Sequence, residues 1–389
     1  MHLPDTPGSA VALDRVRACV IGPDIPHRQS LLVMLEALAI SACSADDSHT
    51  FRSRRGPDLR SRFVRGMDLA FGTRDQDYLD YVLAEIDRSS ADVLIFYWGT
   101  LPLADIVAIK RLRPRLKTML MLLCYPLSLS TAGIVRQWAV LQRAMPSIDA
   151  LICPTAEMQD YLERNLLGGR RRPLIGVVAP CWPDSMCPSV RSEDIADQPN
   201  LVYVGRTDLS GRTVHKADDI RGLMHGVLDA GIELHHAYSP ETDDGHPRRK
   251  QFKPLSVGDL MAVMSGFDAS LVAYNTDACR RTDRFDLTVP DRLLSSVLAG
   301  VPIALPADGY AASRSYLCDY AAVLTFSSPE DLHRQLADRE QISRLKDVAW
   351  KSRRRYVAER QAGALGGLVA AMLARRKSCS GAMARGEAG

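Results

Sequence analysis

The chain has 389 residues, 46% of them hydrophobic and 24% charged, and 49 Lys and Arg residues against 46 Asp and Glu residues give a net charge of +3. This length predicts two domains, because one hydrophobic core rarely grows so large. The composition excludes a disordered, collagen-like or coiled-coil chain, and a charge so close to neutral argues against a dedicated nucleic-acid-binding protein.

The sequence carries no visible signal for export or membrane insertion. The N-terminus lacks a basic region followed by an apolar one, and the longest apolar run, 119–127, is too short to span a bilayer. Nine cysteines are scattered along the chain without a Cys-x-x-Cys pair. This spacing favours buried, reduced thiols over disulfides or a zinc site. We therefore expect a protein of the cytoplasm.

Apolar runs alternate with helical patterns through the first half of the chain. Strands are expected at 16–21, 92–98, 118–124, 150–153 and 174–178. Helices are expected at 29–40, 77–88, 103–112 and 132–144. The polar, Arg-rich residues 43–65 are expected to form a loop. Strands that are apolar on both faces and alternate with helices are typical of a parallel α/β sheet.

A second α/β pattern begins after a stretch rich in Pro, Ser and Asp near residue 185. Its strands are expected at 201–204, 233–238, 269–273 and 301–305, and its helices at 218–230, 256–264 and 291–299. The sequence therefore predicts two α/β domains, 1–184 and 185–349. A C-terminal helix at about 350–375 is expected to pack back on the first domain, and 376–389 to be disordered.

Two segments of the second half carry a resemblance to a known family. In NLVYVGRTDLSGRTVHKADDI a strand ends in Gly205-Arg206, and Lys216 follows ten residues on. In VPDRLLSSVLAGVPIALP a helix starts after Pro290 and runs into a strand. These segments resemble the nucleotide-binding domain of GT-B glycosyltransferases, particularly the large retaining group similar to glycosyltransferase family 4. In the first half, ADVLIFYWG, DALICPTAEMQDYLERN and PLIGVVAPCWPDSMCP are similar to that group's other strands and linker.

The resemblance covers about residues 15–375 and rests on the order of the elements more than on one strict motif. It implies the α/β fold of the GT-B class, with two Rossmann-like domains whose parallel sheets face each other across a cleft. It further implies that the first domain takes an acceptor and that the second takes a nucleoside-diphosphate sugar. That sugar donor is expected as co-substrate, with no cofactor and no metal.

The resemblance also implies a donor site. Gly205 would let the backbone come close to a ligand, while Arg206 and Lys216 would offer hydrogen-bond donors to the diphosphate. Both cations are expected to be catalytic, because negative charge grows on the leaving diphosphate as the glycosidic bond breaks. The start of the following helix is expected to contact phosphate and ribose through four residues: Pro290, Asp291, Arg292 and Ser295.

The chain departs from the family pattern at two donor-site positions. Ser295 stands where the family usually has a Glu that binds the ribose, and Leu287 stands where many members have a Glu near the donor sugar. Asp283 and Asp286 lie beside the second position. A serine offers one short hydroxyl where a glutamate offers two oxygens. These departures leave open whether catalysis is kept.

Candidate acceptor-side residues follow the strands of the first domain. Asp24 and His27 lie in the loop after the first strand and could take a proton from an acceptor hydroxyl in an inverting reaction. Tyr97, Trp98 and Tyr125 lie at the ends of later strands. They are candidates for a platform that binds an acceptor sugar or lipid, or else are packing residues.

We therefore expect a hexosyltransferase-like glycosyltransferase that serves a glycan, glycolipid or natural-product acceptor, as in polysaccharide biosynthesis. The resemblance implies that it is a retaining enzyme. The Arg-rich stretch 52–65 predicts either contact with the inner membrane face or a solvated loop. A second hypothesis is a catalytically degenerate GT-B protein that acts as partner or activator of another glycosyltransferase. A third is a sugar-nucleotide epimerase using Asp283 and Asp286. Nucleotide base, sugar and oligomeric state stay open.

Overall fold

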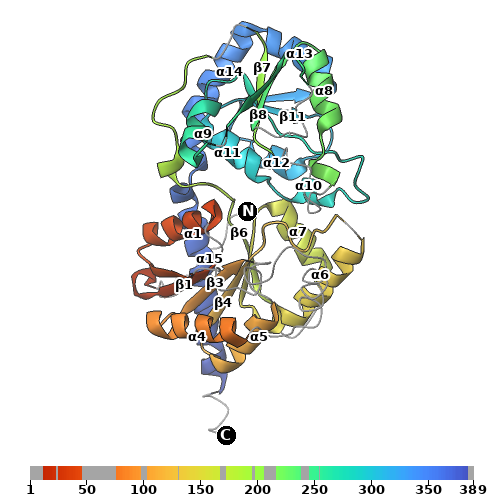
Figure 1. Ribbon diagram of the computed structural model, residues 1–389. Helices are drawn as coiled ribbons and strands as arrows, with labels where there is room; N and C mark the ends of the chain where they lie inside the picture. Colours follow the sequence, from red (N-terminus) through yellow and green to blue (C-terminus); the bar gives the residue numbers. More distant parts are fainter. Residues whose placement is uncertain are drawn as a thin grey trace. The chain divides into compact units, whose positions relative to one another are not determined.

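The computed structural model describes residues 12–22, 25–45, 76–97, 103–129, 131–166, 172–194, 198–205, 216–237, 245–253 and 255–383, with 376–383 described by their backbone alone. The chain divides into two compact units (Figure 1). The first unit holds the described residues up to Pro126, Val135–Ala179 and the chain from Ala358 onward, and the second holds Leu127–Ile134 and Pro180–Val357.

The first unit is built on a six-stranded parallel sheet with the strand order β2-β1-β3-β4-β5-β6. The strands are β1 (Arg17–Ile21), β2 (Ser41–Ala45), β3 (Val93–Tyr97), β4 (Lys117–Met121), β5 (Ala150–Cys153) and β6 (Leu174–Val177). Every residue of β3, β4 and β5 is buried. This burial explains why these strands appear in the sequence as unbroken apolar runs, since helices cover both faces of such a sheet.

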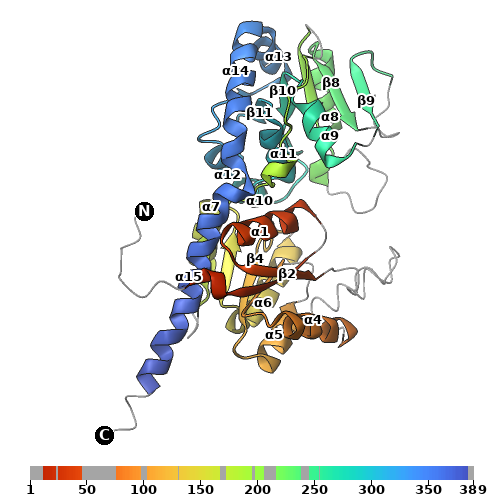
Figure 2. The same cartoon turned by 90° about the vertical axis from the view of Figure 1, so that its left-hand side faces the viewer.

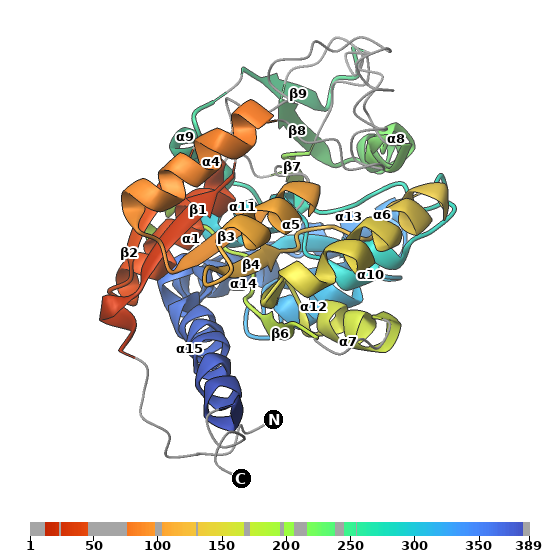
Figure 3. The ribbon, with the colours of Figure 1, turned by 90° about the horizontal axis from the view of Figure 1, so that it is seen from below.

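Among the described residues, the helices around this sheet are α1 (Pro26–Ala37), α4 (Gln76–Ser89), α5 (Leu103–Leu112), α6 (Thr131–Ala144), α7 (Ala156–Asn165) and α15 (Ala358–Met383). The long C-terminal helix α15 packs beside α1 (Figure 2). Helices α4 and α5 lie on the opposite face from α1 (Figure 3). Helix α1 connects β1 to β2, and helix α4 lies in the connection from β2 to β3. Connections between parallel strands are right-handed, and the chain reverses its direction across the sheet after β2, so the two helices lie on opposite faces.

The second unit repeats the plan with the strand order β12-β11-β10-β7-β8-β9, all parallel. Its strands are β7 (Asn200–Tyr203), β8 (Glu233–Ala237), β9 (Arg249–Phe252), β10 (Ala269–Leu271), β11 (Ile303–Pro306) and β12 (Val323–Phe326). One face carries α8 (Arg221–Asp229), α13 (Pro329–Ala337) and the start of α14 (Arg339–Ser352). The other carries α9 (Val257–Met264), α11 (Asp291–Ala299) and α12 (Ala311–Tyr316).

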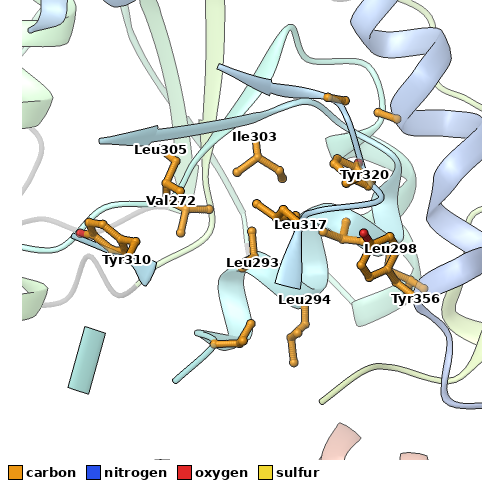
Figure 4. Close-up of a cluster of buried hydrophobic side chains, with 14 of the residues drawn as sticks. Val272, Leu293, Leu294, Leu298, Ile303, Leu305, Tyr310, Leu317, Tyr320 and Tyr356 are labelled. Atoms are coloured by element: carbon orange, nitrogen blue, oxygen red, sulfur yellow. The ribbon is translucent and has the colours of Figure 1, made fainter. Parts of the chain in front are cut away.

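The core of the second face is drawn in Figure 4. Leu293 and Leu298 of α11 pack with Ile303 and Leu305 of β11 and with Val272, which follows β10. Tyr310, Tyr320 and other large side chains close this cluster around α12. Because α11 is buried on most of its surface, its first turn at Pro290 and Asp291 is held at a fixed place beside the strand ends.

The expectation of an α/β fold with two Rossmann-like parallel sheets is confirmed. Three strands were not predicted: β2, β9 and β12. Residues 43–45, expected in a loop, belong to β2, whose sequence SACSA has little apolar content because it is an edge strand with mostly exposed positions. Residues 46–65 lie outside the described part of the chain.

The C-terminal region also differs from expectation. The predicted disordered tail at 376–389 is wrong for 376–383, because α15 continues to Met383 without a proline to break it. Residues 384–389 lie outside the described residues. The units part between Ala179 and Pro180, where the sequence suggested 184 and 185. Helix α15 belongs to the first unit.

Candidate active site

Chemically active residues of the second unit gather at the carboxyl ends of its central strands. Gly205 lies just beyond β7, and Tyr274 lies just beyond β10. The short 3-10 helix η4 (Lys216–Asp218) and the first turn of α11 meet them there. In open α/β sheets, ligands bind outside the carboxyl ends of the strands. This edge is therefore the candidate donor site.

Arg292 joins these segments. Its side chain is 7% exposed, and its Nη1 donates to the hydroxyl of Tyr203 and to the carbonyl oxygen of Ala273, at 2.8 Å each. Its Nη2 donates to Asp218 Oδ1 at 3.3 Å. The guanidinium carbon also lies 4.2 Å from the centre of the Tyr274 ring. A single side chain from α11 thus fixes the ends of two strands and the position of η4.

The charge of Arg292 is balanced by this environment. Burial alone would lower the pKa of Arg292, but the neighbouring Tyr274, Tyr203 and Asp218 raise it above its ordinary value. Burial likewise raises the pKa of Tyr203 to about 12, against the opposing effect of Arg292. The site therefore holds a permanent positive charge next to two neutral phenols at physiological pH.

Three aromatic rings extend the network beside Arg292. The ring of Tyr274 lies 4.7 Å from Phe285 and 6.5 Å from Tyr310, nearly parallel to the latter. The Tyr310 hydroxyl accepts a hydrogen bond from the backbone N–H of Tyr274 at 2.8 Å. Tyr310 adopts a left-handed conformation with φ 61°, which is strained for a bulky residue. Strained residues of this kind gather at functional sites.

Gly205 is required by the packing of this edge. A Cβ at this position would lie 2.1 Å from the Tyr203 hydroxyl oxygen and 2.8 Å from Arg292 Nη1. Such distances are impossible, and Tyr203 is fully buried and has no room to move. The close approach expected at Gly205 is thus made by the chain's own Tyr203, and a ligand contact of Gly205 stays a prediction.

The other predicted donor-site residues lie around this network. Lys216 opens η4 with an exposed side chain, two residues before the partner of Arg292. Pro290 is the N-cap of α11, and Asp291 is exposed in its first turn. Arg206 lies outside the described residues.

Ser295 occupies a different position from the others. It lies more than one turn into α11, half-buried, and its Oγ accepts a hydrogen bond from Trp182 Nε1 at 3.2 Å. Trp182 pairs with Val357 in an isolated bridge within the same unit. The hydroxyl that was expected to contact a ribose is therefore engaged by an indole.

The acidic residues near Leu287 are also engaged. Asp283 pairs with Arg281 Nη2 at 2.8 Å, and Asp286 Oδ1 accepts from the backbone N–H of Ala311 at 3.2 Å. Asp286 thus links α10 (Asp283–Leu287) to the start of α12. These contacts give both carboxylates a role in shaping the loop beside the aromatic rings.

The predicted acceptor-side residues belong to the first unit. His27 lies in the first turn of α1 and is 4% exposed. Tyr97 ends β3 and is buried at the end of β1, where a Cβ on Gly22 would lie 2.5 Å from its ring. Tyr97 thus packs against the end of β1, and a contact of Tyr97 with an acceptor stays a prediction. Tyr125 is half-buried before a cis peptide bond to Pro126. Asp24 and Trp98 lie outside the described residues.

Sequence reasoning missed most of the Arg292 network, including Tyr203, Asp218, Tyr274 and Tyr310. A signal was present, because Tyr203 and Tyr274 each stand at or just after the end of an apolar strand, as Gly205 does. The position of an aromatic residue at the end of a strand is the feature that made Tyr97, Trp98 and Tyr125 candidates in the first unit. The same feature in the second unit identifies both tyrosines.

The described residues contain no group of three or more His, Cys, Asp or Glu side chains able to hold a metal ion. Among the helices of the described chain, none combines the length and the apolar character needed to cross a membrane.

Comparison with known proteins identifies the fold. No protein-family model matches the sequence, and no curated protein matches it. Solved structures do match, including sucrose-phosphate synthase from Thermosynechococcus elongatus, with a TM-score of 0.59 and 12% identity over 93% of this chain and 100% of that one. The UDP-forming α,α-trehalose-phosphate synthase from Burkholderia xenovorans has a TM-score of 0.58 and 11% identity over 90% and 98% of the two chains.

The chain has the GT-B fold. The UDP-GlcNAc 2-epimerase from Methanocaldococcus jannaschii also matches, with a TM-score of 0.52 and 11% identity over 84% of this chain and 94% of that one. The GT-B neighbours thus include both glycosyltransferases and epimerases. At these identities the likeness establishes the fold, and the chemistry has to be argued from the residues of the site.

Proposed function

We propose that this GT-B protein is a glycosyltransferase that moves a sugar from a nucleoside-diphosphate sugar to a hydroxyl acceptor. The observation that carries the proposal is the arrangement around Arg292, which holds Gly205, the first turn of α11 and the helix η4 at one edge of the second sheet. Lys216 opens η4, so its backbone lies at this edge, and its exposed side chain can reach a ligand bound there. This is the edge at which open α/β sheets bind nucleotides.

The proposed roles follow from charge and position. A diphosphate bound here would meet the partial positive charge at the N-terminus of α11 and the side chain of Lys216. Arg206, by resemblance, would add a second cation. In the reaction the oxygen of an acceptor hydroxyl attacks the anomeric carbon, and the bond from that carbon to the diphosphate oxygen breaks. The nucleoside diphosphate leaves, and the hydroxyl proton passes to the leaving diphosphate oxygen in a retaining reaction or to a base in an inverting one. Cations stabilise this leaving group most when the bond is nearly broken.

Arg292 acts in this proposal as a positioning residue. Its guanidinium already donates hydrogen bonds to Tyr203, Ala273 and Asp218. It therefore positions the surrounding elements and does not bind phosphate through a bidentate contact. A UDP-sugar is the first donor to test, because the Burkholderia protein is named for forming UDP and the Methanocaldococcus protein for UDP-GlcNAc. A retaining outcome stays the expectation from the resemblance. Asp24 and His27 stay candidates for the acceptor-side base in the alternative, inverting reaction.

The first experiment is a thermal-shift panel with UDP, GDP, ADP, TDP and CDP. A ligand at about 100 times its dissociation constant adds roughly 2.7 kcal/mol of stability. For a unit of this size that amounts to a rise in melting temperature of about 5–10 °C. The change Lys216→Ala removes one charged contact worth about 1.5–3 kcal/mol, so the dissociation constant should rise about 10- to 100-fold.

The matched control is Lys351→Ala, which removes another exposed lysine, from the last turn of α14. It should bind the nucleotide like the wild type. Binding of one nucleotide that is weakened by Lys216→Ala alone supports the donor site. Unchanged binding in Lys216→Ala would contradict the role given to this residue, and no shift with any of the five nucleotides would contradict the donor site itself.

A second candidate function has its own support in the bond from Trp182 to Ser295. At the position where the resemblance places a ribose-binding glutamate, this chain has a serine whose hydroxyl is occupied. This favours a catalytically degenerate GT-B protein that binds a partner glycosyltransferase. The two candidates differ in turnover: a transferase releases UDP from a UDP-sugar in the presence of an acceptor, whereas the degenerate protein binds nucleotide, if at all, without releasing product.

A further inference from the structure

Two cysteines face each other at the edge of the first sheet. Strands β1 and β2 are parallel neighbours, and their register places Cys19 directly opposite Cys43. Neighbouring strands lie about 4.8 Å apart, and side chains at paired positions point to the same face. This separation falls within the Cα–Cα range of about 4.4–6.8 Å found for disulfides. The register thus places the two thiols side by side, and each of them shifts the pKa of the other.

The two thiols differ in their access to solvent. Cys19 is fully buried in β1, between β2 and β3 in the sheet. Cys43 is partly exposed because β2 is the edge strand and most of its residues face solvent. A reagent in solution would therefore meet Cys43 first, with Cys19 directly behind it.

Helix α4 packs over this pair and completes its environment. The neighbouring Cys19 thiol, with Ser89 and the charge of Arg88 nearby, lowers the pKa of Cys43 below its ordinary value. Burial and the carboxylate of Glu85 oppose this shift. The same pairing with Cys43, together with burial, raises the pKa of Cys19 far above its ordinary value. Of the two thiols, Cys43 is thus the one that ionises first.

Cys153 and Cys187 lack these features. Burial raises the pKa of Cys153, and it raises the pKa of Cys187 to about 12. Neither has a cysteine opposite it in the strand pairings of the described sheets. A low pKa, partial exposure and a neighbouring second thiol together mark reactive cysteines.

We propose that Cys43 is a peroxide-reactive thiolate and that Cys19 is its resolving thiol, so that a reversible disulfide forms between β1 and β2. In the first step the Cys43 thiolate attacks one oxygen of hydrogen peroxide; the O–O bond breaks, Cys43 becomes a sulfenic acid, and hydroxide leaves. In the second step the Cys19 sulfur attacks the Cys43 sulfur, the S–O bond breaks, and water leaves with the Cys19 proton. A thiol reductant restores both cysteines.

The pH dependence of reactivity distinguishes this site from an ordinary thiol. Because its pKa is lowered, Cys43 holds more thiolate at neutral pH than an ordinary cysteine does. A low pKa also weakens the nucleophile, so the advantage over an ordinary thiol is small near pH 7. It grows at mildly acidic pH, where an ordinary thiol is almost fully protonated. The proposal therefore predicts alkylation of Cys43 that persists at pH 6.

The test uses the full-length protein, treated with hydrogen peroxide, blocked with N-ethylmaleimide and digested with trypsin. Cleavage after Arg17, Arg28 and Arg52 separates the two cysteines into the peptides 18–28 and 29–52, each with a single cysteine. The expected result is a linked pair of these two peptides, absent before oxidation and lost after reduction. Oxidation at other cysteines without this linked pair would overturn the proposal.

Two variants separate the roles of the cysteines. In Cys19→Ser a hydroxyl can still donate to the Cys43 sulfur, but the Cys43 sulfenic acid cannot be resolved within the sheet, so dimedone should label Cys43 at least several-fold more than in the wild type. In Arg88→Gln the pH at which Cys43 alkylation reaches half its maximum should rise. Cys318→Ser, which removes an exposed cysteine of the second unit, is the control and should leave the linked pair unchanged. A wild-type alkylation profile centred near pH 8.5 would contradict the assignment of Cys43, whatever the variants do.

Discussion

Replacing Arg292 by methionine tests whether this side chain holds the strand ends of the second unit together. Methionine keeps an unbranched apolar side chain beside the Tyr274 ring but removes every donor. The Tyr203 hydroxyl and the Ala273 carbonyl, both fully buried, then lose their partner. A buried polar group without a partner costs about 1–3 kcal/mol, so two of them cost about 2–6 kcal/mol.

Two effects bring the expected cost into the lower part of that range. The guanidinium no longer has to be buried, and Asp218, whose side chain is 21% exposed, can be hydrated in place of its ion pair. We expect Arg292→Met to lower the free energy of unfolding by about 2–4 kcal/mol. Arg344→Met, which removes a 69% exposed arginine paired with Glu340 on α14, is the control and should change it by less than about 0.5 kcal/mol.

The assay is urea unfolding followed by circular dichroism, extended to a double-mutant cycle with Tyr203→Phe. Phenylalanine removes the hydroxyl that Arg292→Met would leave without a partner. The double variant should therefore be about 1–2 kcal/mol more stable than the sum of the two single changes predicts. A loss below 1 kcal/mol in Arg292→Met, together with additive single changes, would refute the network as a structural element.

Three further predictions concern stability. Gly205→Ala places a methyl group 2.1 Å from the Tyr203 hydroxyl. Thermal melting should therefore show that the free energy of unfolding falls by about 2 kcal/mol or more. A wild-type melting temperature would contradict the packing described. Asp149→Asn leaves Lys110, bound at 2.6 Å, without a counter-charge and should cost about 3–5 kcal/mol in urea unfolding; a cost under 1 kcal/mol would argue against this buried pair. Burial raises the pKa values of Tyr203 and Tyr310 to about 12. Because these tyrosines ionise first in the unfolded chain, the free energy of unfolding should fall as pH rises from about 10 to about 12. A free energy of unfolding that stays constant over that interval would contradict their burial.

In acid, the free energy of unfolding should change with pH in the opposite direction and fall as the pH falls. Burial raises the pKa of Asp149, but the hydrogen bond from Lys110 and the surrounding charges outweigh it, so the pKa lies below the ordinary value. The stabilisation is therefore complete above the pKa of the unfolded chain, near pH 4, and is lost as pH falls through the folded value. Acid titration of the wild type and Asp149→Asn should differ in this interval.

Buried strands were predictable from the sequence. β5 was placed at its observed bounds, and β3 and β4 within a few residues of theirs, because full burial leaves an uninterrupted apolar run. Edge strands were not predictable in this way. β2 and β9 have mostly exposed or half-buried positions, and their pairing depends on neighbours far away in the sequence. These edge strands thus form because they pair with distant strands, and the local sequence pattern does not show this.

The candidate site was predictable only as a location. The sequence placed Gly205, Lys216 and Pro290 near one sheet edge, since strand ends and a helix start can be recognised locally. It did not predict that Arg292 would be turned toward Tyr203 and Ala273, or that Trp182 would reach Ser295. These contacts join residues 19 to 113 positions apart, and no spacing rule identifies them.

The most direct test of the donor site is hydrogen–deuterium exchange of the wild-type protein with and without the nucleotide that gives a thermal shift. The account predicts slower exchange in peptides that cover the end of β7, η4, the residues after β10 and the first turn of α11, while strands β1 to β6 of the first unit exchange as before. Protection confined to the first unit, or protection of the second unit that spares η4 and the first turn of α11, would contradict it.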